Sequence, residues 1–196
     1  MRDARISRKT SETDIALYLN LDAAERVNID TGVGFLDHML ELFARHGCFG
    51  LEVTCHGDTK VDDHHSVEDI GIVLGAALAQ ALGNKAGIKR YGSILLPMDE
   101  ALALCSLDLS GRSCLRMTVT FPREKIGSFD TELVQEFFLA VTRSAGMTLH
   151  IRMLDGENGH HIAEAIFKGF GRALREAVSM DEHFAGKIPS TKGVLA

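Results

Sequence analysis

Apolar and polar residues alternate along several short stretches of the chain, which is typical of β-strands with one buried face. Other stretches follow the longer period of an amphipathic helix, and Gly47 supplies a C-terminal stop for the first of these. The first half predicts a strand, a return strand that forms a hairpin with it, a helix, a strand and a second helix, at 15–21, 27–29, 34–47, 49–55 and 64–82.

The second half of the chain repeats this order. It predicts two strands joined by a tight turn at 110–113, then a helix, a strand and a helix, at 100–109, 115–121, 131–145, 147–154 and 160–178. The pattern predicts an α+β fold of internally duplicated ββαβα half-domains, packed as one unit. Each half-domain is expected to be a mostly antiparallel sheet with helices on one face.

The linking segments suggest where the half-domains begin and end. We expect the first half-domain at 1–84, a connector at 85–93, the second half-domain at 94–180 and an irregular tail at 181–196. Gly169 and Gly171 lie within the last predicted helix and form no phosphate loop, so they are expected to permit close helix packing.

Composition narrows the class of protein. The chain has 196 residues, a net charge of −6 and 45% hydrophobic residues, which excludes wholesale disorder and argues against a general nucleic-acid binder. No apolar run approaches the roughly 18 residues of a membrane span, and the N-terminal segment has no apolar signal region. The four cysteines form no CxxC pair, which favours a cytoplasmic protein with free thiols over a zinc finger or disulfide scaffold.

Two short motifs carry the strongest chemical signal. HHSVE begins at His64 and HHIAE begins at His160, at equivalent places in the repeat. On a helix the first histidine and the glutamate four positions later lie on one face, and the adjacent histidine points about 100° away. One helix can therefore offer one imidazole to each of two ions. Imidazole with carboxylate suits Mn, Fe, Zn or Ni.

The repeat also predicts a further ligand on each preceding helix. His38 lies 13 residues before Leu51, and Glu136 lies 13 residues before Leu149, which opens the equivalent strand. The predicted metal ligands are His38, His64, His65, Glu68, Glu136, His160, His161 and Glu164. Asp37 and Asp69 are candidates to orient these histidines through hydrogen bonds.

Two functional classes are compatible with such ligands taken by themselves. One is a dinuclear metal-dependent phosphoesterase, and the other is a metal-binding oligomer without activity. A four-helix di-iron carboxylate protein is disfavoured, because strands alternate with the helices.

Longer motifs single out one family. The chain resembles imidazoleglycerol-phosphate dehydratase from Arg5 to Leu195, through GFLDHMLELFARHG (34–47), DDHHSVEDI (62–70), PMDEAL (97–102), DLSGR (108–112), GENGHHIAEAIFKGFGRALREA (156–177) and PSTKGVL (189–195). The resemblance implies a hydro-lyase of histidine biosynthesis, a pathway of amino-acid biosynthesis. Its substrate is D-erythro-imidazole glycerol phosphate and its products are imidazole acetol phosphate and water. It also implies two Mn²⁺ per active site and a 24-subunit homo-oligomer with sites between subunits.

The resemblance assigns roles to individual residues. The eight predicted ligands match the metal positions of the family, with Glu136 standing where many members have histidine. Glu12 matches a glutamate that contacts substrate and is our first candidate for proton transfer, with Glu68 and Glu164 as the others. The implied substrate-binding residues, which include the phosphate ligands and part of the tail, are Glu12, His38, His46, His64, His65, Glu68, Arg90, Arg112, Ser190, Thr191 and Lys192.

The reaction explains the need for two ions. The proton is lost from a carbon next to the imidazole ring, with no carbonyl beside it to accept the electrons. An imidazolate that bridges two cations supplies that electron sink. We therefore expect a metal-bridged imidazolate, a carboxylate that moves the proton, and a diazafulvene-like intermediate that expels the hydroxyl group.

Overall fold

The computed structural model describes residues 1–195, and its elements follow the same order in both halves. The first half contains β1 (Asp3–Lys9), β2 (Thr13–Asn20), β3 (Val27–Asp30), α1 (Gly34–Gly47), β4 (Gly50–Gly57) and α2 (His64–Leu82). The second half contains β5 (Tyr91–Met98), β6 (Ala101–Asp108), β7 (Cys114–Thr118), α3 (Glu132–Ala145), β10 (Thr148–Asp155) and α4 (Gly159–Val178). A small hairpin of β8 (Lys125–Ile126) and β9 (Phe129–Asp130) precedes α3, and the tail contains the 3-10 turn η1 (Glu182–Phe184).

In its four-stranded sheet, each half has three strands before the first helix, where the sequence predicts two. The additional strands are β1 and β5. In β1 only Ala4 is buried, so the alternation of apolar and polar residues is weak there. In β5, which begins within the predicted connector 85–93, Gly92 and Pro97 are residue types that usually mark turns. Each half is therefore βββαβα.

The two sheets have the same strand order, β1-β2-β4-β3 and β5-β6-β10-β7. Both predicted hairpins are wrong: β3 pairs in parallel with β4, and β7 pairs in parallel with β10. β4 and β10 come later in the chain, and each lies between the two strands that were expected to pair. Alternation identifies the buried face of a strand but not its neighbour, so it could not reveal this crossover. The other pairings are antiparallel, as expected.

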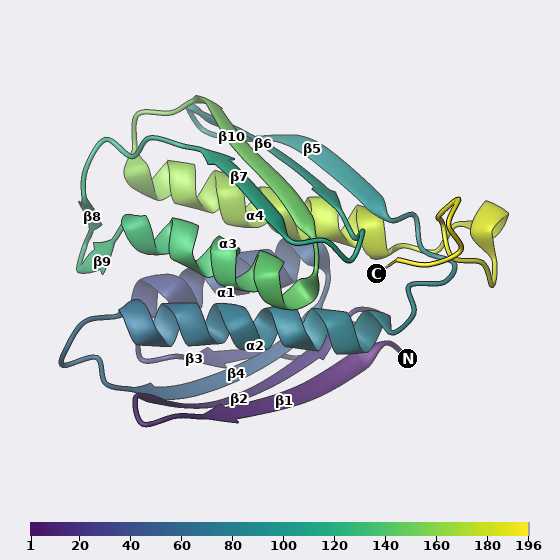
Figure 1. The fold of residues 1–196 in the computed structure, drawn as a ribbon. Coiled ribbons are helices and arrows are strands. Elements are labelled where there is room, and N and C mark those ends of the chain that lie inside the picture. The colour runs from purple at the N-terminus through teal and green to yellow at the C-terminus, as the bar shows by residue number, and fades with distance from the viewer. Residues whose placement is uncertain (196) are drawn as a thin grey trace.

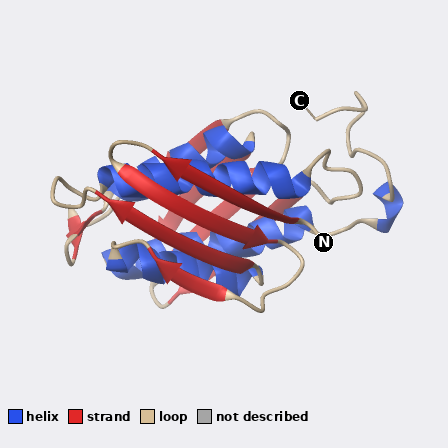
Figure 2. Cartoon of the chain, turned by 90° about the horizontal axis from the view of Figure 1, so that it is seen from below, coloured by secondary structure: helices blue, strands red, loops and turns tan. Residues whose placement is uncertain are grey.

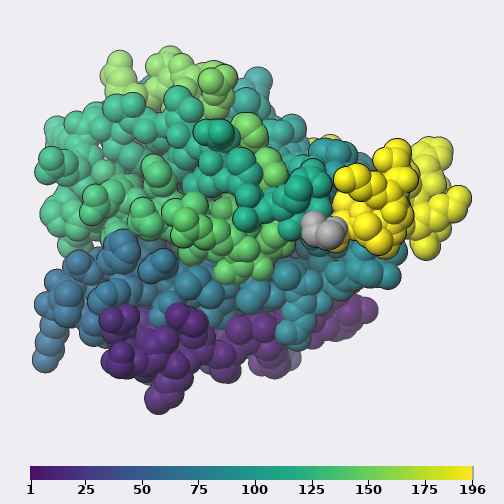
Figure 3. Space-filling view, viewed as in Figure 1, coloured from purple at the N-terminus to yellow at the C-terminus, as the bar shows by residue number. Residues whose placement is uncertain are grey.

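The molecule has a sheet on each outer side and the four helices between them (Figure 1). In the view from below, the strands of the first sheet lie in front of the helices (Figure 2). Helix α1 packs beside α4, and α2 packs beside α3, so each pair joins the two halves. The tail extends from one end of the body, away from the start of α4 (Figures 1 and 3).

Close helix contacts show that the two halves are related by an approximate twofold axis. A Cβ atom on Gly75 of α2 would lie 2.6 Å from the carbonyl oxygen of Val141 in α3. A Cβ atom on Gly171 of α4 would lie 2.6 Å from the carbonyl oxygen of Phe43 in α1. Gly75 and Gly171 occupy the same place relative to the two HHxxE motifs. The α2–α3 and α1–α4 contacts are therefore equivalent, and the packing role expected for Gly171 is confirmed.

We predict that Gly171→Ala destabilises the chain by about 1–3 kcal/mol, because the methyl group meets backbone atoms that cannot move aside cheaply. Thermal unfolding measures the change. Gly34→Ala is the matched control, since among the described residues nothing lies within 4 Å of its Cβ position. A Gly171→Ala chain as stable as wild type would contradict the close contact.

The core between the sheets is aliphatic and phenylalanine-rich. Phe43 packs on Phe49 and Phe170, and Phe138 packs on Phe167 and Phe170, so one aromatic cluster links α1, α3 and α4. Within residues 1–195, none of the helices combines the length and apolarity that crossing a membrane requires.

Candidate metal centre and phosphate pocket

Three predicted ligands meet where α1 lies beside α4. Nε2 of His38 lies 3.0 Å from Oε1 of Glu164, and Nε2 of His160 lies 3.1 Å from the same oxygen. The possible donor atoms of these three residues all lie within 4.8 Å of one another. Two imidazoles and a carboxylate at this spacing suit a divalent transition metal, so the residues present fit such an ion.

Glu164 has a cationic partner that the sequence reasoning missed. Nζ of Lys168 lies 2.5 Å from Oε2 of Glu164, and it also contacts the sulfur of Met98 at 3.2 Å. Burial raises the pKa of Glu164, but hydrogen bonds from Lys168 and His38 outweigh it and lower that pKa to about 2. The (i, i+4) spacing of Glu164 and Lys168 is the signal that could have revealed the pair.

Aromatic side chains form one wall of this cluster. The ring of Phe35, one turn before His38 on α1, meets the ring of His160 edge-on at 5.3 Å. Phe129 of the hairpin β8–β9 packs on Phe35 at 5.0 Å. The imidazole of His160 is therefore oriented both by the hydrogen bond to Glu164 and by an apolar contact.

The repeat assigns His64, Glu68 and Glu136 to the equivalent position between α2 and α3. Nε2 of His64 lies 4.0 Å from Oε2 of Glu68. By the twofold relation, Glu136 occupies on α3 the position that His38 occupies on α1. Among the described residues the three-ligand cluster contains only His38, His160 and Glu164, so the ligand role of Glu136 stays a prediction.

The second histidine of each motif contacts different carboxylates. Nδ1 of His65 lies 3.1 Å from Oδ2 of Asp58, and Nδ1 of His161 lies 2.7 Å from Oε2 of Glu100. These hydrogen bonds raise the pKa of both imidazoles. The bond from His161 is also the main cause that lowers the pKa of Glu100 to about 2.

Asp58 and Glu100, rather than Asp37 and Asp69, are therefore the acids that orient histidines. Asp37 accepts hydrogen bonds from Thr31, and Asp69 accepts hydrogen bonds from Thr13 and Arg8. Asp58 lies in the loop between β4 and α2, and Glu100 lies in the turn between β5 and β6. No sequence spacing links them to the histidines, so only folding could reveal the pairs.

Glu12, the first candidate for proton transfer, lies beside one of these histidines. Its Oε1 is 3.7 Å from Nε2 of His65, and its side chain is 49% exposed. Glu12 stands in the turn between β1 and β2, close to the start of α2. His46 lies farther along α1 from His38, and burial together with Lys168 and Arg172 lowers its pKa.

The predicted phosphate ligands also meet, but at the other end of the molecule. Arg90, Arg112, Ser190, Thr191 and Lys192 line one cavity of about 1120 Å³ between the body and the tail. Arginine and lysine with a hydroxyl group form a suitable site for a phosphate. The cavity gathers these residues from segments far apart in the sequence.

Arg90 holds the tail against the body. Its Nε lies 2.7 Å from Oδ1 of Asp108, and its Nη1 donates to the carbonyl oxygen of Pro189 at 2.8 Å. The hydrogen bond to Asp108 raises the pKa of Arg90, so this guanidinium stays protonated at neutral pH. Its backbone N–H donates to the carbonyl of Ala177, near the end of α4.

One chain does not bring the two sites together. His160 is near the first residue of α4, and the phosphate cavity lies beside its last turn. At 1.5 Å per residue, the 17 residues from His160 to Ala177 span about 25 Å. This distance is too long for one small phosphorylated imidazole to reach both sites.

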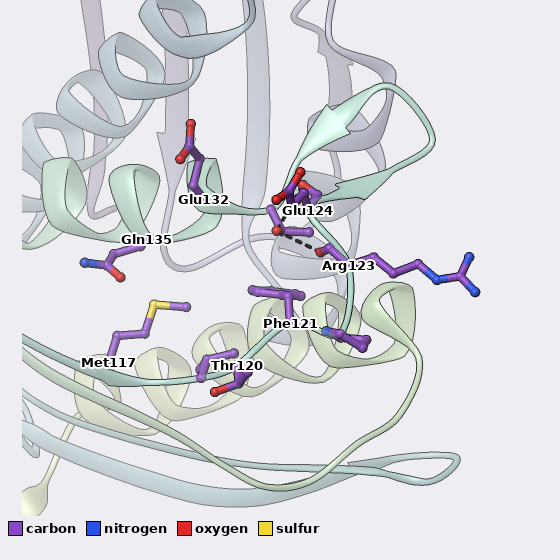
Figure 4. A pocket seen from close by; sticks show the side chains of 10 residues that line it. Met117, Thr120, Phe121, Arg123, Glu124, Glu132 and Gln135 are labelled. Carbon is purple, nitrogen blue, oxygen red and sulfur yellow. Dashed lines mark hydrogen bonds between the residues drawn. The ribbon is translucent and has the colours of Figure 1, made fainter.

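Another hollow, beside the hairpin β8–β9, contains none of the predicted site residues. Met117, Phe121 and Gln135 contribute to its lining (Figure 4). The hydroxyl group of Thr131 donates to the carbonyl oxygens of Arg123 and Glu124 at 3.1 Å, which anchors the segment before β8. The shape of this hollow therefore follows from the anchored segment before β8, and no predicted site residue contributes to it.

Comparison with known proteins identifies the family. The sequence model for imidazoleglycerol-phosphate dehydratase matches residues 31–174. Two curated relatives of that name, from Methylobacterium radiotolerans and Desulforamulus reducens, are each 58% identical to this chain, and the alignments cover 100% and 99% of it and 100% and 98% of the relatives. The chain belongs to the imidazoleglycerol-phosphate dehydratase family.

Solved structures of this family have the same fold. Imidazoleglycerol-phosphate dehydratase from Staphylococcus aureus matches with a TM-score of 0.82 and 42% identity, over 91% of this chain and 99% of that one. The enzyme from Pyrococcus furiosus, in complex with (S)-C348, matches with a TM-score of 0.84 and 38% identity, over 97% and 100%. These comparisons confirm the duplicated α+β fold and the assignment as a dehydratase, and they give no support to the phosphoesterase alternative.

Proposed function

We propose that this chain dehydrates D-erythro-imidazole glycerol phosphate to imidazole acetol phosphate and water, at a site shared between copies of the chain. Membership of the dehydratase family supports the reaction, a step of histidine biosynthesis. The observation that carries the shared site is the separation of about 25 Å between the metal ligands and the phosphate cavity along α4. A neighbouring copy can place its phosphate cavity beside the metal ligands of the first.

Two Mn²⁺ ions per active site are the proposed cofactor. His38, His160 and Glu164 would hold one ion, and His64, Glu68 and Glu136 the other. Since Nδ1 of His65 and of His161 faces a carboxylate, the Nε2 atom of each is the nitrogen left for a metal held mainly by another copy. When bound, the ions supply Lewis acidity toward the nitrogens of the substrate's imidazole ring.

The residues of the chain supply the remaining chemistry. Glu12 would take the proton from the carbon next to the ring, since its carboxylate is accessible and lies close to His65. Glu68 and Glu164 serve mainly as ligands in this scheme. At the other end, Arg112 and Lys192 would neutralise the phosphate, with the Ser190 and Thr191 hydroxyl groups as donors.

A shared site requires assembly, and we propose a closed homo-oligomer of 24 subunits. Closed symmetric assemblies repeat the same contact in every copy, so every metal end would meet a phosphate end. We place the enzyme in the cytoplasm, in keeping with its four cysteines, which are all free thiols.

Metal removal tests this function directly. The protein as purified should contain about two Mn per chain and elute as a large assembly, and chelation should remove turnover and the assembly together. Metal analysis with sizing chromatography and a substrate assay, before and after chelation and after Mn²⁺ is restored, measures all three. A metal-free monomer with full activity would refute the proposal.

Arg112→Ala should raise KM for the phosphorylated substrate by at least about tenfold and change kcat much less, since a charged hydrogen bond to phosphate is lost away from the reacting carbon. Arg116→Ala, on the neighbouring strand β7 and outside the lining of the cavity, is the matched control. An unchanged KM in the Arg112 variant would exclude the phosphate role.

A further inference from the structure

The two proposed metal positions are equivalent in the backbone but not in charge. The twofold relation that pairs Gly75 with Gly171 also pairs Glu68 with Glu164 and His38 with Glu136. Figure 1 shows the two helix pairs that carry these residues, α1 beside α4 and α2 beside α3. Any difference between the positions therefore arises from the side chains.

The position between α1 and α4 is close to neutral before a metal arrives. Its single carboxylate, Glu164, is 10% exposed, and its Oε2 lies 2.5 Å from Nζ of Lys168, which is itself 15% exposed. A divalent ion that binds Glu164 must compete with this ammonium group. Breaking a nearly buried ion pair is costly, because the lysine loses its partner.

The position between α2 and α3 has the opposite character. It has two carboxylates, Glu68 and Glu136, and Ile72 stands where the other half has Lys168. The side chain of Glu68 is 42% exposed, and Asp62 and Asp63 directly precede the motif on α2. The two carboxylates assigned to this position carry a charge of −2, which favours a divalent cation.

We propose that the two metal positions fill in order. The first ion binds between α2 and α3, and the second binds more weakly between α1 and α4, because Lys168 must release Glu164. This inference rests on the proposed function, since it takes the same residues as ligands. The difference of two charges at direct ligand distance predicts dissociation constants that differ by at least about tenfold.

Calorimetric titration of the chelator-stripped enzyme with MnCl₂ tests the order, with free Mn²⁺ followed by its EPR signal and assembly followed by sizing at each ratio. Two classes of one ion per chain are expected. Lys168→Met should tighten only the weaker class, and Glu136→Gln should weaken only the tighter class. Lys9→Met is the matched control, because Lys9 pairs with Asp14 on the exposed part of β1 and β2.

Two Mn²⁺ ions per chain that bind with equal dissociation constants would overturn the proposal. A Lys168→Met variant that binds the weaker ion less tightly would also overturn it, as would a Glu136→Gln variant that affects only the weaker class. Circular dichroism shows whether each variant is folded. Each variant by itself tests which metal position holds the class of ion that it is expected to change. Turnover by the fully loaded wild-type enzyme separates the two proposals. If turnover is normal while the classes are equal, only the order is wrong; if the loaded enzyme has no turnover, the proposed function is wrong.

Discussion

Co-expression of two defective variants, Glu164→Gln and the double variant Arg112→Ala/Lys192→Ala, is expected to restore about one quarter of wild-type activity in assemblies that contain equal numbers of both chains. Each variant alone should have little activity when substrate is well below the wild-type KM. In the mixed assembly, half of the metal positions and half of the phosphate cavities are intact. If each site takes them from different chains, a quarter of the sites are complete.

Differently tagged chains, purified on both tags in turn, supply the mixed assembly, and the measurement is turnover per site. Co-expression of Glu164→Gln with His38→Ala is the control. Both changes damage the position between α1 and α4, so every chain is defective there and no activity should return. A mixed assembly of the first pair that also stays inactive would refute a site shared between chains.

Glu12→Gln should lower kcat by at least about 100-fold, because the amide keeps the shape of the carboxylate but cannot accept the proton. Metal content and assembly should not change, since Glu12 is not among the proposed ligands and its side chain is half exposed. Glu25→Gln, at an exposed position outside the proposed site, is the matched control. The readouts are steady-state turnover, metal analysis and sizing.

Near-normal turnover by the Glu12 variant would show that another group takes the proton, and it would refute this assignment. Loss of metal together with activity would instead make Glu12 a ligand, which contradicts its assigned role. Metal content must be measured because Oε1 of Glu12 lies 3.7 Å from Nε2 of His65, a proposed metal ligand.

Much of the fold could be predicted from local pattern. The helices α1, α2, α3 and α4 have apolar positions at helical spacing, and their predicted bounds agree closely with the structure. In the two four-stranded sheets, the sequence did not predict β1, where a single buried alanine provides almost no signal, or β5, where Gly92 and Pro97 suggest a turn. Strand neighbours failed for a different reason, because pairing joins residues that no local period connects.

The sequence by itself determined the chemistry of the protein: two HHxxE motifs in a repeat, a further ligand candidate on each preceding helix, and a family resemblance that the comparisons confirmed. Residue type and helical period depend only on residues that are near one another in the chain, so they can be read directly from the sequence. Only the tertiary structure decided which groups meet. It paired His38 with Glu164 across the two halves, set Lys168 against that glutamate, and placed the phosphate cavity at the far end of α4. These contacts depend on how helices and sheets pack, because packing brings together residues that are distant in the chain.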